Sequence, residues 1–287
     1  MQSDGPNAQQ IEYWNEQAGA KWVRLQSFLD AQLRPFGEAA MEGLGSLEGK
    51  SILDVGCGCG STTLELGGRV GADGSVLGVD LSLPMLTQAR QGAAEAKPDT
   101  AHGQVSFQQA DAQGHAFERQ FDAVFSRFAV MFFADPVAAF TNLRGALKAG
   151  GRLSFICWQP IDRNQWMMVP LLATLEHLPP PEKPAADAPG PFSLADPERV
   201  RRILRESKFR DVDVIAHAAK MVVGEGYSLD EITDFVMEVG PTSRLLKDAS
   251  ATLRTAVSDS VRAALAKFQE DGAVRMDAAA WLVSARA

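Results

Sequence analysis

The sequence predicts an α/β protein whose core is a doubly wound, mostly parallel sheet. Between residues 51 and 158, short apolar segments alternate with stretches of helical periodicity, the pattern of strands joined by crossover helices. A glycine-rich turn directly follows the first of these segments. The chain has 287 residues, of which 46% are hydrophobic and 22% charged, so it can bury a large core and is not expected to be disordered.

The N-terminal part is expected to be helical. Apolar residues recur there at spacings of three and four, which places them on one face of a helix from residue 11 to residue 33: Ala18, Trp22, Leu25, Leu29 and Leu33. Pro35 is expected to end this helix, because proline has no backbone N–H to donate.

Five strands are expected in the core: residues 51–55, 75–79, 105–109, 121–126 and 152–158. Side chains that can cap the helices after the first two strands are Ser61, Thr62, Thr63 and Ser82. A further helix is expected to begin at Asp135-Pro136 and to end at Gly150-Gly151.

Beyond residue 158 the regular alternation stops. Helical signals cover residues 163–178, 197–207, 229–239 and 253–268, and two more strands are expected at 212–216 and 281–285. Ser228 and Glu231 form the pattern of a capping box at the start of one of these helices. Six prolines between residues 179 and 191 exclude a helix or a central strand there. Their irregular spacing favours an ordered or gating loop over a ligand for an SH3-type domain.

These elements suggest one core with three additions. The expected parts are an N-terminal helical cap (1–44), a ligand-binding core (45–158), a first lid insertion (159–195), a core helix and strand (196–225), a second helical lid insertion (226–272) and a final core strand (273–287). Helices inserted into such a sheet after its strands are expected to cover the crevice at the carboxyl ends of the strands, where ligands bind.

The charge balance bears on possible partners. There are 28 Lys and Arg residues against 36 Asp and Glu residues, a formal net charge of −8, which disfavours a protein that binds nucleic acid through broad phosphate contacts. No apolar run reaches the roughly 20 residues of a membrane span. With three cysteines, no secretory signal pattern and no disulfide framework, the cytoplasm is the expected location.

The most informative motif is the turn Asp54-Val55-Gly56-Cys57-Gly58-Cys59-Gly60 between a strand and a helix. Glycines at such a turn allow positive φ and a close approach of a ligand to the backbone. The dinucleotide fingerprint requires a third glycine where this chain has Ser61. Asp80, at the end of the second strand, is placed to accept hydrogen bonds from two ribose hydroxyls.

In these residues the sequence resembles the class I S-adenosylmethionine-dependent methyltransferases, in particular the branch of the ubiquinone and menaquinone C-methyltransferases. The matching stretches are Ile52 to Gly60, Val79 to Leu86, Gln109 to Ala112, Phe121 to Ser126 and Leu143 to Leu153. The resemblance covers about residues 50–158. It implies a seven-stranded Rossmann-like sheet whose last strand is antiparallel, with helical lid insertions, and S-adenosylmethionine as methyl donor without a metal.

The resemblance also implies residues that contact the donor. Asp54 and the backbone of Gly56, Cys57 and Gly58 would hold its amino-acid end, and Asp80 would bind the ribose. Leu81 and Met85 would lie against the adenine, and Asp111 and Ala112 would bind its amino group and ring. Ser126 and Arg127 would lie beneath the methyl donor.

Four other residues are candidates for the site. Arg127 is either one half of a surface ion pair or a clamp for an anionic group of the acceptor, because a guanidinium fork binds carboxylates and phosphates well. His177 is a structural residue at a helix end or a general base. Tyr13 is a possible donor contact. Trp22 either packs in the core or walls the site, where an aromatic face would suit a sulfonium.

The function expected from this pattern is methyl transfer by in-line displacement to O, N or C of a small, partly apolar acceptor. One alternative is an NAD-dependent oxidoreductase, whose glycine turn differs from this one and whose catalytic tyrosine has only Tyr13 and Tyr227 as candidates. The other is a non-catalytic S-adenosylmethionine-binding protein. The sequence leaves open the acceptor and the oligomeric state.

Overall fold

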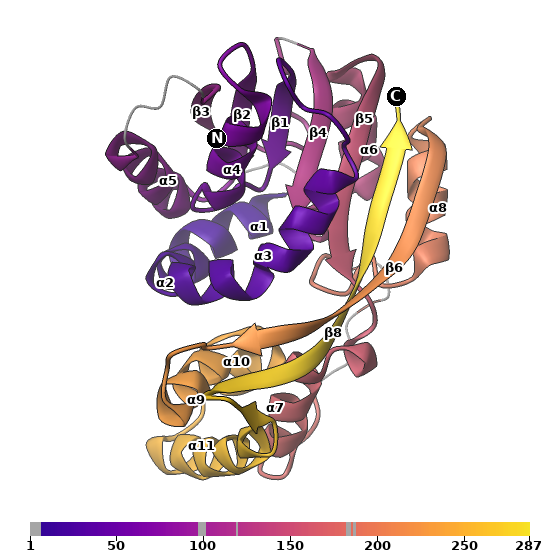
Figure 1. Ribbon diagram of the computed structural model, residues 1–287. Helices are drawn as coiled ribbons and strands as arrows, with labels where there is room; N and C mark the ends of the chain where they lie inside the picture. The colour runs from indigo at the N-terminus through magenta and orange to yellow at the C-terminus, as the bar shows by residue number, and fades with distance from the viewer. Residues whose placement is uncertain (1–6, 97–101, 119, 182–184, 186–187) are drawn as a thin grey trace.

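The computed structural model describes residues 7–96, 102–118, 120–181, 185 and 188–287. A single mixed sheet forms its centre, with strands in the order β3-β2-β1-β4-β5-β8-β6 (Figure 1). The bounds of these seven strands are β1 Ser51–Val55, β2 Ser75–Asp80, β3 Gln104–Gln109, β4 Phe121–Arg127, β5 Leu147–Trp158, β6 Arg210–Val223 and β8 Ala273–Arg286. A two-residue strand, β7 (Gln269–Glu270), pairs with β8.

The predicted fold class is confirmed. β1 to β5 pair in parallel, whereas β8 lies between β5 and β6 and is antiparallel to both. The expected last strand of residues 281–285 therefore exists, but as part of a strand that starts at Ala273. Residues 278–280 are three alanines, so the alternation that marks a strand is weak there.

Helices cover the sheet in two layers. α3 (Gln26–Glu42), α4 (Ser61–Val70) and α5 (Leu83–Glu95) pack against the strands, with α3 in front of the sheet and α6 (Pro136–Gly145) behind it in Figure 1. α8 (Pro197–Glu206) contacts α6 and β6. Fully buried aromatic side chains fill the space between the layers: Phe36, Phe121, Phe125, Phe140 and Phe155.

Two expected helix ends were wrong. Pro35 lies inside α3, because the buried face that includes Leu33 and Phe36 gains more from continuing the helix than the one missing N–H costs. α6 ends at Gly145 rather than at Gly150-Gly151, because the chain turns at once to pair Leu147 with Phe121 at the start of β5.

The N-terminal helix is also divided. It consists of α1 (Ala8–Glu12), a π-helical stretch η1 (Tyr13–Ala18), α2 (Gly19–Arg24) and then α3. There is no room for a side chain at Gly19, since a Cβ there would lie 2.3 Å from the Trp14 carbonyl oxygen and 2.4 Å from Ser82 Oγ. Because Gly19 has no side chain, the N-terminal segment can pass close to Ser82, at the start of α5.

The two expected insertions form one helical lobe. α7 (Gln165–Leu175), α9 (Leu229–Glu238), α10 (Gly240–Leu245) and α11 (Ala251–Ala266) pack together around the far ends of β6 and β8, below the core in Figure 1. The capping box of Ser228 and Glu231 opens α9 as predicted. Part of the proline-rich loop expected at 179–191 lies outside the described residues.

α2 and α3 connect this lobe to the core. Lys21 Nζ donates to the Glu238 carbonyl oxygen and to Ser243 Oγ, both at 3.2 Å. The Phe28 ring stacks on Phe235, with ring centroids 4.6 Å apart and planes 13° apart. α2 and α3 therefore contact both the core and the helical lobe. In the described ranges, no helix is both long and apolar enough to cross a membrane.

Candidate active site

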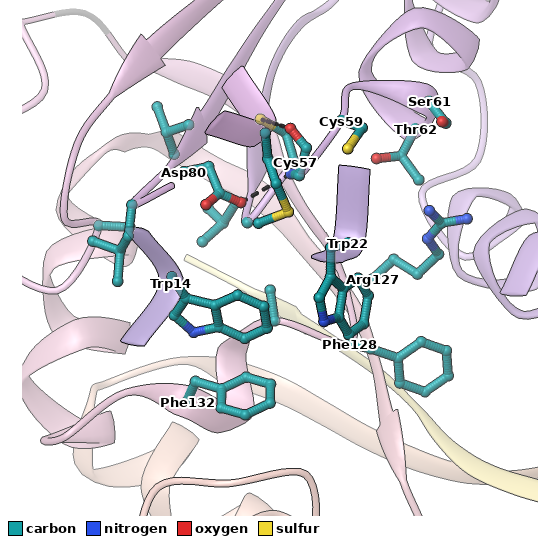
Figure 2. A pocket seen from close by; sticks show the side chains of 18 of the residues that line it. Trp14, Trp22, Cys57, Cys59, Ser61, Thr62, Asp80, Arg127, Phe128 and Phe132 are labelled. Carbon is teal, nitrogen blue, oxygen red and sulfur yellow. Dashed lines mark hydrogen bonds between the residues drawn. The ribbon is translucent and has the colours of Figure 1, made fainter. Parts of the chain in front are cut away.

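A cavity lies at the carboxyl ends of β1, β2 and β4, where the sequence predicted a ligand site (Figure 2). It encloses about 1090 Å³ of empty space, part of it open to solvent. Its base is the glycine turn after β1. Its roof comes from η1, α2 and α3, which contribute Trp14, Trp22, Gln26, Leu29, Asp30 and Leu33. Among the residues that the structure describes, none that lines the cavity comes from the helical lobe, so the described parts of the expected lid insertions do not wall it.

The glycine turn takes the conformation that its sequence predicts. Gly56, Gly58 and Gly60 have φ of 69°, 55° and 88°. Gly56 also has no room for a side chain, because a Cβ would lie 2.0 Å from Ala129 Cβ. Beside Gly58, by contrast, the only atom of the described residues that a Cβ would meet within 4 Å is Met85 Sδ, at 3.8 Å. That open side of the backbone faces the cavity and suits a bound ligand.

Asp54 lies beneath this turn rather than in the cavity wall. Its Oδ2 accepts hydrogen bonds from Thr62 Oγ1 and Thr63 Oγ1, both at 2.7 Å, and its Oδ1 has no partner among the described residues. The two threonines were expected to cap α4, but Gly60 takes the N-cap position. Burial raises the pKa of Asp54 to about 6 against the opposing effect of the two hydroxyls. A direct contact with a ligand, as the sequence suggested, would have to use Oδ1.

This raised pKa has a consequence for stability. A carboxyl whose pKa is about 6 when folded and 3.8 when unfolded favours folding below pH 4 and loses that contribution as the pH rises through 6. The loss amounts to about 3 kcal/mol of unfolding free energy. We expect Asp54→Asn to lack it, so wild type should weaken relative to the variant between pH 4.5 and 7. Urea unfolding at both pH values measures this, and a constant difference between the two proteins would contradict it.

Asp80 holds the turn from the neighbouring strand. Its Oδ2 accepts from the Gly58 N–H at 2.9 Å and its Oδ1 from the Ser82 N–H at 2.8 Å. Burial raises the pKa of Asp80, although these backbone N–H groups oppose the rise. The carboxylate lines the cavity, as do Leu81, which directly follows β2, and Met85 on α5. Asp80, Leu81 and Met85 therefore share one part of the cavity lining, and their contacts with a donor stay a prediction.

Asp111 follows β3, the strand next to β2, and lines the cavity beside Ala112. Its Oδ1 accepts from Asn7 Nδ2 at 2.8 Å and from the Gln113 N–H at 3.0 Å. Asn7 Oδ1 in turn accepts from the Ala134 N–H at 3.0 Å. Asn7 is buried and lines the cavity, yet the polar N-terminal segment gave no signal for it.

Arg127 reaches the cavity from the end of β4. Its Nη2 lies 2.8 Å from Asp30 Oδ1 on α3, and both side chains are mostly buried. Arg127 is therefore part of an ion pair, but the pair lies in the cavity wall rather than on the surface. Figure 2 shows the guanidinium pointing toward the start of α4, where Ser61 and Thr62 lie.

Comparisons with known proteins agree with this geometry. The family model for a methyltransferase domain matches residues 52–151. Aklanonic acid methyltransferase DauC from Streptomyces sp. (strain C5) is 31% identical over 161 residues, which are 53% of this chain and 70% of the relative. The chain belongs to the S-adenosylmethionine-dependent methyltransferases. It is an enzyme that transfers a methyl group to a small molecule.

Other similar proteins are less identical in sequence, but the matches cover more of this chain. Nocamycin O-methyltransferase from Saccharothrix syringae is 28% identical over 225 residues, 71% of this chain and 79% of the relative. A solved structure of a protein from Bacillus halodurans C-125 shares the fold, with a TM-score of 0.54 at 17% identity, and the match covers 87% of this chain and 97% of that one. These findings support the methyltransferase interpretation over an oxidoreductase.

Aromatic side chains form much of the methyltransferase's cavity wall. Trp14 is in edge-to-face contact with Trp22 and with Phe132, at centroid distances of 5.6 and 5.4 Å. Trp22 therefore lines the cavity and packs at the same time. Phe128, at the end of β4, has a φ of 55° and stacks on Trp158 at 3.8 Å.

Three candidates lie elsewhere. Tyr13 lines a second hollow, with Phe132 and Arg244, and not the main cavity. Ser126 is fully buried and donates to the Val55 carbonyl oxygen at 2.8 Å, so its hydroxyl joins β4 to β1. His177 is exposed at the end of α7, and its Nε2 lies 2.8 Å from Ser260 Oγ of α11. Its helix belongs to the lobe, and the role of general base is not supported by this position.

The three cysteines are free thiols. Cys57 and Cys59 line the cavity and Cys157 is buried in the core. Burial raises the pKa of all three thiols, that of Cys59 to about 12, so none is a ready nucleophile at neutral pH. Within the described ranges, no group of three or more His, Cys, Asp or Glu side chains is arranged to hold a metal ion.

Proposed function

We propose that the donor lies extended across the carboxyl ends of β3, β2 and β1. In this arrangement Asp111 and Ala112 bind the adenine, with Leu81 and Met85 along it, and Asp80 accepts from the ribose hydroxyls. The observation that carries the proposal is the row of acceptors along neighbouring strand ends, joined by the open face of the glycine turn. Carboxylates at these positions match a ligand with an amino group and two hydroxyls.

When bound, S-adenosylmethionine supplies an activated methyl group, which passes to the attacking atom of the acceptor as its bond to sulfur breaks. The chain's own part is to orient the two substrates and to exclude water, which can lower the barrier by roughly 7–11 kcal/mol. The rings of Trp14, Trp22 and Phe132 are suited to the second task. Their faces also favour a cation over water at the same place.

The acceptor proposed for this cavity is a small molecule with an aromatic or quinone-type ring, methylated at oxygen or carbon. Apolar and aromatic side chains supply most of the roof, which suits a flat apolar ring. Among the relatives are a 2-phytyl-1,4-naphtoquinone methyltransferase and a ubiquinone biosynthesis O-methyltransferase, 32% and 37% identical over 50% and 42% of this chain. Their names fit a ring of this kind.

Nucleic acid is not a proposed acceptor, given the net charge of −8. The three free thiols favour a reducing compartment, and we propose the cytoplasm.

Two measurements test this function in order. Titration calorimetry with S-adenosylmethionine, S-adenosylhomocysteine and NAD is expected to show binding of the two sulfur compounds and none of NAD. Transfer of a labelled methyl group is then followed with naphthoquinols and catechols, and with aliphatic amines of similar size as the control. Binding of NAD alone would overturn the donor site, and transfer to the amines alone would overturn the acceptor class.

A further inference from the structure

At its polar end the cavity is lined by an ion pair, Arg127 and Asp30. Arg127 Nη2 and Asp30 Oδ1 are 2.8 Å apart, with the two side chains 16% and 22% exposed. Ser61 Oγ hydrogen bonds to the other Asp30 oxygen, and Gln26 Nε2 lies 3.4 Å from Ser61 Oγ. All four side chains line the cavity. The cluster therefore joins β4, α3 and the first residue of α4.

The fold makes room for this pair. The Arg127 side chain passes α3 at Gly37, where a Cβ would lie 3.0 Å from Arg127 Cδ. A mostly buried ion pair adds little to stability on its own, since its desolvation offsets its attraction. Only one of the five guanidinium donors has a partner among the described residues, so the fork keeps capacity for a further anion.

The pair lies where the amino-acid end of the donor would be expected. Because β4 is next to β1 in the sheet, the pair lies beyond the glycine turn, at the end opposite to Asp111. A donor with its adenine at Asp111 and its ribose at Asp80 would direct its amino acid there. An amino acid carries an ammonium and a carboxylate on one carbon, and the pair offers one partner for each.

We propose that Asp30 and Arg127 hold the amino-acid end of the donor, and this inference rests on the donor site proposed above. Arg127, together with the N-terminal end of α4, binds the carboxylate, because both present positive charge and N–H groups. Asp30 accepts from the ammonium and orients the guanidinium. Arg127 is then not an anchor for the acceptor, and a residue on α3, outside the matched domain of residues 52–151, takes part in donor binding.

Two probes separate this role from a structural one. S-adenosylhomocysteine carries the amino acid, whereas 5′-methylthioadenosine has the same nucleoside without it. In Asp30→Asn and Arg127→Gln we expect the Kd of S-adenosylhomocysteine to rise about ten- to a hundredfold in each variant. The Kd of 5′-methylthioadenosine is expected to stay within about twofold of wild type, because neither side chain reaches the nucleoside.

Glu65→Gln is the matched control, since it breaks the Glu65–Arg69 pair on α4, which does not line the cavity. It is expected to leave both affinities unchanged. Equal losses for the two probes in Asp30→Asn or Arg127→Gln, or no loss for S-adenosylhomocysteine, would overturn the inference while the donor site stands. If wild type binds neither probe, the donor site and the pair's role both fall. Thermal unfolding of each variant checks that it folds.

Discussion

Replacing Asp80 with alanine is expected to abolish donor binding. The change removes the acceptor for two ribose hydroxyls, and hydrogen bonds to a charged group contribute about 1.5–3 kcal/mol each. It also removes the bonds that hold the Gly58 and Ser82 N–H groups. The Kd of S-adenosylhomocysteine should rise by at least about a hundredfold, measured by titration calorimetry.

Two further variants make this result interpretable. Asp80→Asn keeps one acceptor oxygen but no charge, so its affinity should fall between those of wild type and Asp80→Ala. Asp122→Asn removes a carboxylate that accepts from the Ser51 N–H and pairs with Lys148, away from the cavity, and should bind as wild type does. An unchanged Kd in Asp80→Ala, with the variant folded, would show that the ribose lies elsewhere.

Much of the core could be predicted from the sequence because its signals are local. The strand ending at Val55, the turn of three glycines and the acidic residue ending β2 are each encoded within a few neighbouring residues. Parallel strands place their carboxyl ends at one edge of the sheet, so Asp80 and Asp111 had to come close together. The edge of the sheet that carries the cavity thus followed from the predicted parallel direction of the strands.

The roof could not be predicted in the same way. Asp30 pairs with Arg127 across 97 residues of sequence, and Asn7 with Asp111 across 104. Such contacts depend on how α3 crosses the sheet, and Pro35 even suggested that this helix ends early. The position of His177 could not be predicted for a related reason, because an insertion's place in the sequence does not say which side of its helices faces the core.

A second large effect is expected from Gly56→Ala. At φ of 69° a side chain is strained, and here its Cβ would also come 2.0 Å from Ala129 Cβ, so β1 and the turn after β4 must separate. We expect a loss of at least about 3 kcal/mol of unfolding free energy, measured by urea unfolding, with loss of donor binding.

Gly49→Ala separates the two causes. Gly49 has nearly the same φ, 67°, but an added Cβ there meets nothing within 4 Å. That variant should lose only the roughly 1–2 kcal/mol of left-handed strain and should keep its affinity for S-adenosylhomocysteine. If both variants lose the same free energy of unfolding, the backbone relieves the contact with Ala129 without cost. The close approach at Gly56 would then not constrain the turn. If Gly56→Ala alone unfolds readily, then the glycine is there because two chain segments meet at the floor of the cavity, and the donor's binding surface depends on that approach.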